Sequence, residues 1–200
     1  MIERVFVFIC LLLTVLLPGL IAAQQPTKVP RIGFLAVAPL STLAQRTEAF
    51  RQGMRELGYS EGKNTFIEWR SAEGNPDRVP KVAADLVQLK VDVIVTAGSR
   101  ATHSAKAATV TIPIVMAQDP DPVANGFVAS LARPGGNITG LSILSPELSG
   151  KRLELLKEIV STLSRVAVFG TSTSAEAIKS LEEIKLTAGA MKCRFNTWTY

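Results

Sequence analysis

The sequence predicts an α/β protein built on a doubly wound parallel sheet, and three observations support this. Short apolar runs alternate with amphipathic segments between residues 30 and 143. The apolar runs are rich in Val, Ile and Ala, which is typical of strands that are buried on both faces. The connections between them are short, as they are in repeated strand–helix units. We therefore expect a parallel sheet with helices on both faces.

The elements follow one another in a regular order. The expected strands are residues 31–36, 64–69, 91–97, 112–117 and 138–143. The first expected helix runs to Leu57 with Ser41 or Thr42 as its N-cap, and Gly58 suits its carboxyl end. The second helix is expected to begin at residues 75–77, and two further helices are expected at 101–108 and 121–131. The simplest strand order for such a chain is 2-1-3-4-5.

After Pro146 the pattern changes phase, which predicts a separate second lobe over residues 144–200. A helix is expected at 147–160, a strand at 165–170 and a helix at 175–190. Only two strands are expected in this region, and two strands do not make an independently buried sheet. The prediction is a complete N-terminal α/β lobe at residues 30–143 and an incomplete second lobe.

The N-terminus has the order of a secretory signal peptide, predicted at residues 1–23. A short charged start precedes an apolar stretch, residues 5–17, and Ala23 offers a cleavage site after a small residue. The apolar stretch is shorter than the roughly 20 residues that span a bilayer, although an uncleaved anchor is the alternative. Residues 24–29 form a polar lead-in. After cleavage Cys193 would be the single cysteine, so no internal disulfide is expected.

Composition argues against several function classes. The net charge is +5, but the Lys and Arg residues are scattered, so we expect no nucleic-acid partner. One histidine and no paired cysteines give no metal-binding pattern, and no metal or cofactor is expected. The first strand–helix turn lacks the dinucleotide-binding glycines, and no serine stands in a nucleophile-elbow sequence. The chain is therefore not expected to be an enzyme.

The carboxyl ends of the strands are the expected functional edge, because doubly wound sheets bind ligands there. Gly98 and Ser99 follow the third strand, where helix N–H groups and a serine hydroxyl suit a carboxylate. The alternative is that Ser99 is a plain N-cap. Asp119, followed by Pro120, could pair with a ligand ammonium. Its alternative is an Asp-Pro turn in which Asp119 or Asp121 caps the next helix.

The turn after the first strand is the third part of this edge. Leu40 and Ser41 could contact a ligand, or they could belong to the cap of the first helix. The residues themselves leave both readings open. His103 lies on the helix after Ser99 and is expected to be an exposed helical residue rather than a catalyst.

Three long stretches resemble bacterial substrate-binding proteins of ABC transporters. They are "AFRQGMRELGYSEGKN" at 49–64, "IEWRSAEGNPDRVPKVAADLVQLKVDVIVTAGS" at 67–99 and "IPIVMAQDPDPVANGFVASLARPGGNITGLS" at 112–142. The chain is similar to the branch that includes binders of tryptophan and related amino acids. The resemblance covers residues 30–170 and becomes poor after Gly170, so we expect a truncated second lobe.

The resemblance implies a periplasmic-binding-protein-like I fold whose two lobes close on a ligand. It implies a periplasmic or extracytoplasmic solute-binding component of an ABC importer, with a small molecule such as an amino acid as ligand and a membrane permease as partner. It favours Gly98 and Ser99 for the ligand carboxylate, Asp119 for its ammonium and Asp121 for the cap. The alternatives are a sensory ligand-binding module of the same fold, an exported α/β enzyme or a non-functional fragment. We expect weak or undetectable ligand binding by the isolated chain and poor stability beyond Pro146.

Overall fold

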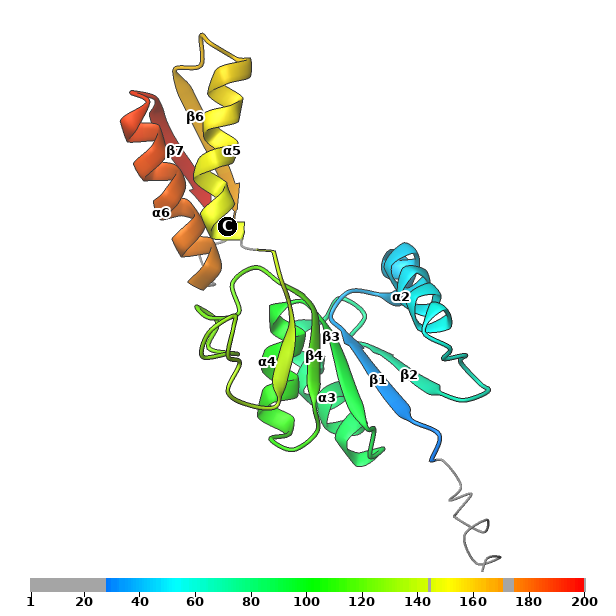
Figure 1. The fold of residues 1–200 in the computed structure, drawn as a ribbon. Coiled ribbons are helices and arrows are strands. Elements are labelled where there is room, and N and C mark those ends of the chain that lie inside the picture. Colours follow the sequence, from blue (N-terminus) through cyan, green and yellow to red (C-terminus); the bar gives the residue numbers. More distant parts are fainter. Residues whose placement is uncertain (1–27, 144, 171–174, 200) are drawn as a thin grey trace, which may run out of the picture.

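A five-stranded parallel sheet forms the centre of the N-terminal segment (Figure 1). The computed structural model describes residues 28–143, 145–170 and 175–199. The strand order is β2-β1-β3-β4-β5, as the sequence predicts, and every pairing is parallel. β3 lies in the middle of the sheet, in agreement with its apolar sequence. The strands are β1 (Arg31–Ala36), β2 (Phe66–Ser71), β3 (Val93–Ala97), β4 (Ile114–Asp119) and β5 (Ile138–Ser142).

Helices cover both faces of this sheet, and alternation along the strands gives each face its own core. On one face, Leu35 and Ile94 pack with α3 (Val79–Gln88) and α4 (Ser99–Ala108). On the other face, Phe34 and Val95 pack against Phe50 of α2 (Ala44–Glu56). The doubly wound α/β architecture predicted from the sequence is confirmed.

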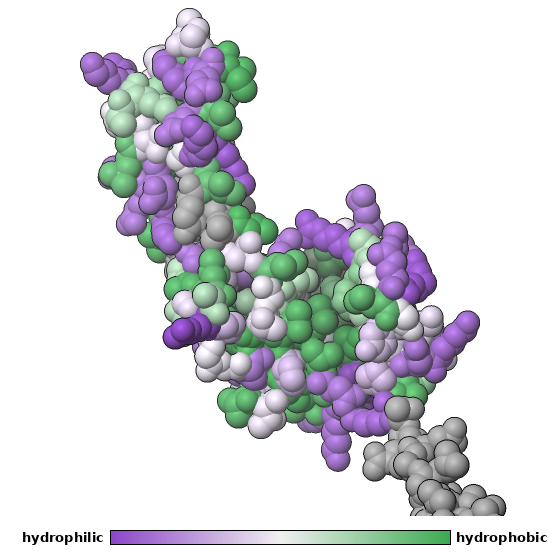
Figure 2. Space-filling view, viewed as in Figure 1, coloured by the Kyte–Doolittle hydropathy of each residue, from purple (hydrophilic) through white to green (hydrophobic). Residues whose placement is uncertain are grey.

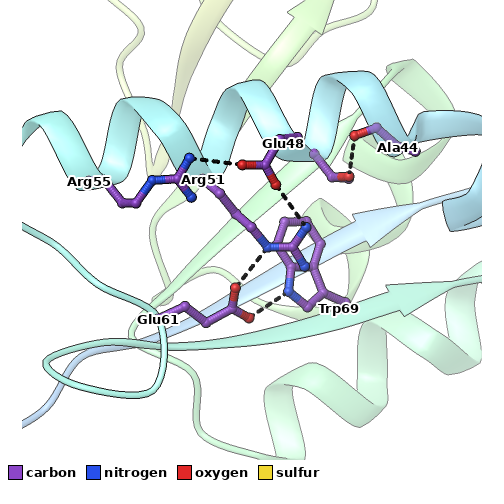
Figure 3. A network of polar contacts seen from close by, with 7 residues as sticks. Ala44, Glu48, Arg51, Arg55, Glu61 and Trp69 are labelled. Atoms are coloured by element: carbon purple, nitrogen blue, oxygen red, sulfur yellow. Dashed lines mark hydrogen bonds and ion pairs between the residues drawn. The ribbon is translucent and has the colours of Figure 1, made fainter.

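A polar network fastens α2 to the β2 edge of the sheet (Figure 3). The Arg51 guanidinium lies 4.3 Å from the centre of the Trp69 ring, and its Nε donates to Glu61 at 2.8 Å. Trp69 Nε1 donates to the other oxygen of Glu61 at 2.8 Å. Arg55 and Glu48 form a further ion pair on α2. These contacts join α2 to the sheet, because Trp69 belongs to β2.

The helix expected at residues 121–131 is not formed, and turns connect β4 to β5 instead. Gly126 adopts φ 67°, which ends helical bonding after one turn, and the Phe127 and Val128 amides both donate to the Pro122 carbonyl. Phe127 and Val128 are buried in the core that α3 and α4 form. The apolar residues that suggested a helical face are therefore buried by a compact loop.

The α2 face of the sheet is only partly covered. An apolar groove of about 670 Å³ lies between α2 and the strands β3 to β5. Figure 2 shows hydrophobic side chains gathered in this hollow, next to the largely polar outer surface of α2. Residues that line the groove include Phe34, Phe50, Val95, Val115, Met116 and Leu141.

Several element boundaries differ from the prediction by about two residues. β2 and β4 begin and end two residues later than expected, so that Asp119 is the last residue of β4. Ser41 and Thr42 do not cap α2, because they lie in a 3₁₀ turn, η2 (Leu40–Leu43), and Thr42 Oγ1 donates to the Pro39 carbonyl. The next connection follows the prediction: Asn75 caps the short η3 (Pro76–Arg78) by accepting from the Asp77 amide.

The C-terminal segment contains α5 (Ser145–Ile159), β6 (Arg165–Gly170), α6 (Ala175–Ala190) and β7 (Arg194–Thr199). β6 and β7 pair in parallel as a two-stranded sheet, so the terminal stretch supplies the second of the two expected strands. Leu153, Ala188 and Cys193 form its small buried cluster. The opposite face is open, and Phe169 and Trp198 are 76% and 63% exposed there.

Within the described residues, no helix combines the length and apolar character needed to cross a membrane. The predicted signal peptide at residues 1–23 and its cleavage site lie outside the described residues. The expectation that this segment does not pack into the N-terminal lobe therefore stays a prediction.

Candidate ligand-binding site

The carboxyl ends of β3 and β4 lie side by side and point toward the C-terminal segment (Figure 1). Ala97 at the end of β3 pairs in register with Gln118 of β4. Gly98 then adopts φ 92° and α4 begins at Ser99. A Cβ added at Gly98 would meet nothing within 4 Å, so the space beside this turn is open. The arrangement leaves the first N–H groups of α4 beside open space.

Ser99 is the first residue of α4, and Gly98 occupies the N-cap position. The alternative in which Ser99 is a plain N-cap is therefore wrong, since no side-chain cap bond is made at this end. Thr102 holds the turn instead: its amide and its hydroxyl both donate to the Gly98 carbonyl, at 3.1 Å and 3.2 Å. The Thr102 hydroxyl also bonds that of Thr96 in β3 at 2.8 Å, so the turn is fixed to the buried sheet.

Asn125 joins Ser99 to Asp119. Its Nδ2 donates to Asp119 Oδ1 at 3.0 Å and lies 3.5 Å from Ser99 Oγ. Sequence reasoning missed Asn125 because it placed this residue inside a helix. The Asn125-Gly126 pair is a turn signal and could have identified the loop.

Asp119 is completely buried and organises the loop that follows β4. Its Oδ1 also accepts from the Asp121 amide at 3.0 Å, and its carbonyl accepts from the Ile143 amide at 3.0 Å. Asp119 therefore contributes to an Asx-type turn. The predicted contact between its carboxylate and a ligand ammonium is untested and stays a prediction.

Asp121 caps the turn after β4, in agreement with the capping role predicted for it, although the turn does not continue as a helix. Its Oδ1 accepts from the Ala124 amide at 3.0 Å, and its Oδ2 lies 2.8 Å from Lys179 Nζ of α6. Burial alone would raise the pKa of Asp121, but the Ala124 amide and the Lys179 ammonium lower it below its ordinary value. Asp121 is therefore ionised at neutral pH.

The remaining predicted residues lie at the same edge of the sheet. Leu40 packs against the cluster beneath α2, whereas Ser41 is exposed on η2. Pro120 is half-buried between the two aspartates. His103 is exposed on α4, as predicted, and its ring meets that of Phe127 edge to face with centroids 4.5 Å apart. The structure thus joins Ser99 to Asp119 through Asn125 and gives Leu40 a packing role.

The site offers helix N–H groups and a hydroxyl next to the open space at Gly98, and the Asn125 amide links them to the buried Asp119 carboxyl group. Such groups can recognise a small zwitterion by hydrogen bonds and charge. Within residues 28–143, 145–170 and 175–199, no group of three or more His, Cys, Asp or Glu residues is placed to hold a metal ion.

Comparison with known proteins assigns the family. A family profile described as "ABC transporter substrate binding protein" matches residues 33–199. The chain therefore belongs to the ABC transporter substrate-binding protein family, as its sequence pattern indicates. The match runs through β6, α6 and β7, so the expectation that the resemblance fades after Gly170 is wrong. Proteins of this family bind solutes and are extracytoplasmic.

Individual relatives agree with this assignment. The tyrosine-binding protein of Clostridioides difficile strain R20291 is 31% identical over 142 residues, which are 70% of this chain and 40% of that protein. The crystal structure of a conserved domain protein from Vibrio cholerae has a TM-score of 0.79 at 31% identity and covers 86% of this chain and 58% of its own. The sequence thus spans about half the length of its relatives.

A third comparison concerns the fold alone. An ABC domain from Streptococcus pneumonia, solved in complex with L-Trp, has a TM-score of 0.76 at 24% identity. It covers 86% of this chain and 57% of its own. The shared region includes a parallel sheet like the one described above, which supports the predicted fold class.

Proposed function

We propose that this chain is part of an extracytoplasmic solute-binding component of an ABC importer, and that its ligand is an amino acid with an aromatic side chain. The observation that carries the proposal is the chain of contacts from Ser99 through Asn125 to Asp119, beside the open N-terminus of α4. The names of two relatives, a tyrosine-binding protein and an L-Trp complex, support this ligand class.

The proposed binding mode uses the two ends of the amino acid separately. The ligand carboxylate accepts from the first N–H groups of α4 and from the Ser99 hydroxyl, where the helix dipole favours negative charge. The ligand ammonium lies on the side of Asp119 and Asn125, where carboxyl and amide oxygens can accept hydrogen bonds from a cation. Leu40, Ser41 and Pro120 flank this position at neighbouring strand ends.

Binding is tested with L-tyrosine, L-tryptophan and two tyrosine analogues. Tyramine lacks the carboxylate, and 4-hydroxyphenylpropionate lacks the ammonium, so each analogue removes one proposed contact. Calorimetry, with ligand-observed NMR for weak binding, is expected to show saturable binding of an intact amino acid and much weaker binding of both analogues. Equal binding of tyrosine and tyramine would contradict the carboxylate site at α4.

A matched pair of serine variants locates the contact. Ser99→Ala is expected to weaken amino-acid binding by about tenfold or more, because a hydrogen bond to a charged group contributes about 1.5–3 kcal/mol. Ser104→Ala lies on the same helix and is the control, with an expected change below about twofold. The permease partner belongs to the same proposal, and co-purification with permease and ATPase subunits would support transport over a sensory role.

A further inference from the structure

The N-terminal and C-terminal segments do not share a hydrophobic core in the part of the chain that the structure describes. Each of the three clusters of buried apolar residues lies wholly within one segment. Of the ion pairs recorded between described residues, Lys179–Asp121 alone joins the two segments. Lys179 thus links α6 to the loop that follows β4.

This ion pair differs from an ordinary surface pair, since one partner is buried. The Asp121 side chain is 7% exposed and that of Lys179 is 42% exposed, with 2.8 Å between Oδ2 and Nζ. The second Asp121 oxygen is bonded to the Ala124 amide, so the carboxylate is held in one orientation. A charge-assisted bond between such groups is weakly screened by salt.

The loop that carries Asp121 is also the loop that organises the site. The Asp121 amide donates to Asp119 Oδ1, which also accepts from Asn125 Nδ2. Ile143, where β5 leads into the C-terminal segment, donates its amide to the Asp119 carbonyl. One buried residue, Asp119, thus contacts the site, the loop and the junction between the segments.

We propose that the Lys179–Asp121 pair is a latch that holds the C-terminal segment against the ligand site, with Asn125 as the positioning residue that links latch and ligand. The link to a ligand rests on the proposed function, whereas the latch itself does not. A ligand bound at Ser99 and Asn125 stabilises the same loop that Lys179 engages. The Lys179–Asp121 pair and a ligand bound at Asn125 therefore stabilise the same loop and favour each other.

Hydrogen exchange of the ligand-free chain tests the latch. Lys179→Gln removes the cation, Lys179→Arg keeps it, and Lys185→Gln removes an exposed lysine from the same helix as the control. In Lys179→Gln, exchange across residues 119–126 and at the Ile143 amide is expected to become faster by about tenfold, the scale of one charge-assisted bond. Lys179→Arg and Lys185→Gln are expected to stay within about twofold of the parent chain. Equal exchange in Lys179→Gln and Lys185→Gln would overturn the latch.

The link to the ligand is tested separately with L-tyrosine and L-tryptophan. In the parent chain, the bound amino acid is expected to slow exchange across residues 119–126 about fivefold or more, a typical coupling between two sites. In Asn125→Ala, affinity and this protection are both expected to fall, whereas the Lys185→Gln control keeps both. If Asn125→Ala bound the amino acid and its residues 119–126 were protected from exchange as fully as in the parent chain, the positioning role of Asn125 would be overturned. If the parent chain binds neither amino acid, the proposed function and the link to a ligand fail, and the exchange data on the ligand-free chain still decide the latch.

Discussion

The two sheets of this protein are built from the same kind of strand–helix unit but are covered to different extents. In the N-terminal segment, β3 has a strand on each side, and Ile94 is completely buried beneath α3 and α4. In the C-terminal segment, helices pack on one face of the β6–β7 pair, and Trp198 on the other face is 63% exposed. Local sequence thus specifies each unit, whereas the number of neighbouring units decides how much of it is buried.

The largest expected difference compares two helical leucines. Leu86 in α3 is completely buried, whereas Leu186 in α6 is 70% exposed. Leu86→Ala is expected to lower the free energy of unfolding by about 2–5 kcal/mol, because it leaves a cavity under the sheet. Leu186→Ala is expected to change it by less than about 0.5 kcal/mol. Urea unfolding measures both, and equal losses would contradict the contrast in burial.

A second prediction concerns close packing between strands. Gly140 in β5 has φ 144°, and a Cβ there would meet the Met116 carbonyl oxygen at 2.2 Å. Gly140→Ala is expected to lower the free energy of unfolding by about 1–3 kcal/mol, since backbone of β4 has to shift. Gly53→Ala in α2 is the control: its Cβ meets nothing within 4 Å, and alanine is expected to stabilise the helix by about 0.5–1 kcal/mol. Thermal unfolding that ranked the two variants in the opposite order would be evidence against this strand geometry.

A third prediction addresses the open face of the second sheet. Phe169 and Trp198 are paired in register across β6 and β7 and are both exposed. Trp198→Ser is expected to lower the free energy of unfolding by about 0.2–1 kcal/mol, the scale of one cross-strand pair. Self-association should decrease in the same variant, because an exposed aromatic pair on a sheet face promotes contact between chains. Light scattering across a concentration series measures this effect, and unchanged association would show that chains do not associate through this face.

The smallest expected effect is a change of stability with pH. It distinguishes β1, whose first amide bonds a titrating carboxylate, from β7, whose first amide bonds a carbonyl. The Asp92 carboxylate accepts from the Arg31 amide at the start of β1 and pairs with Lys28, whereas β7 starts with a bond from the Arg194 amide to the Ser164 carbonyl. The Lys28 hydrogen bond and the Arg31 amide lower the pKa of Asp92 below its ordinary value of 3.8. Its stabilising contribution is therefore complete above pH 3.8 and lost as the pH falls through the lowered pKa.

Asp92→Asn is the variant that isolates this contribution. The free energy of unfolding is expected to fall less between pH 6 and pH 3 in Asp92→Asn than in the parent chain, because the titrating group is gone. Asp77→Asn, at the solvent-exposed η3 turn, is the matched control. If the free energy of unfolding changed with pH in the same way in Asp92→Asn and in the parent chain, Asp92 would not be the cause of the acid destabilisation.

Strand periodicity alone was sufficient to predict most of the N-terminal fold. Apolar strands separated by short connections predict parallel pairing, and the right-handed connections of such units limit the possible strand orders. Gly98 and Ser99 could be placed at the carboxyl edge of the sheet because their position follows from where β3 ends. These features depend on neighbours along the chain, which the sequence shows directly.

Only the tertiary structure decided which residues that are distant in the sequence contact one another. The stretch 121–131 has an amphipathic pattern, but Gly126 adopts a positive φ, and burial of Phe127 under the sheet stabilises a loop. That loop brings Asn125 to Ser99 and Asp119, and Asp121 to Lys179, which lies 58 positions away in the sequence. Local periodicity cannot predict such contacts, because their energies depend on burial and on the distance between groups that only the folded chain brings together.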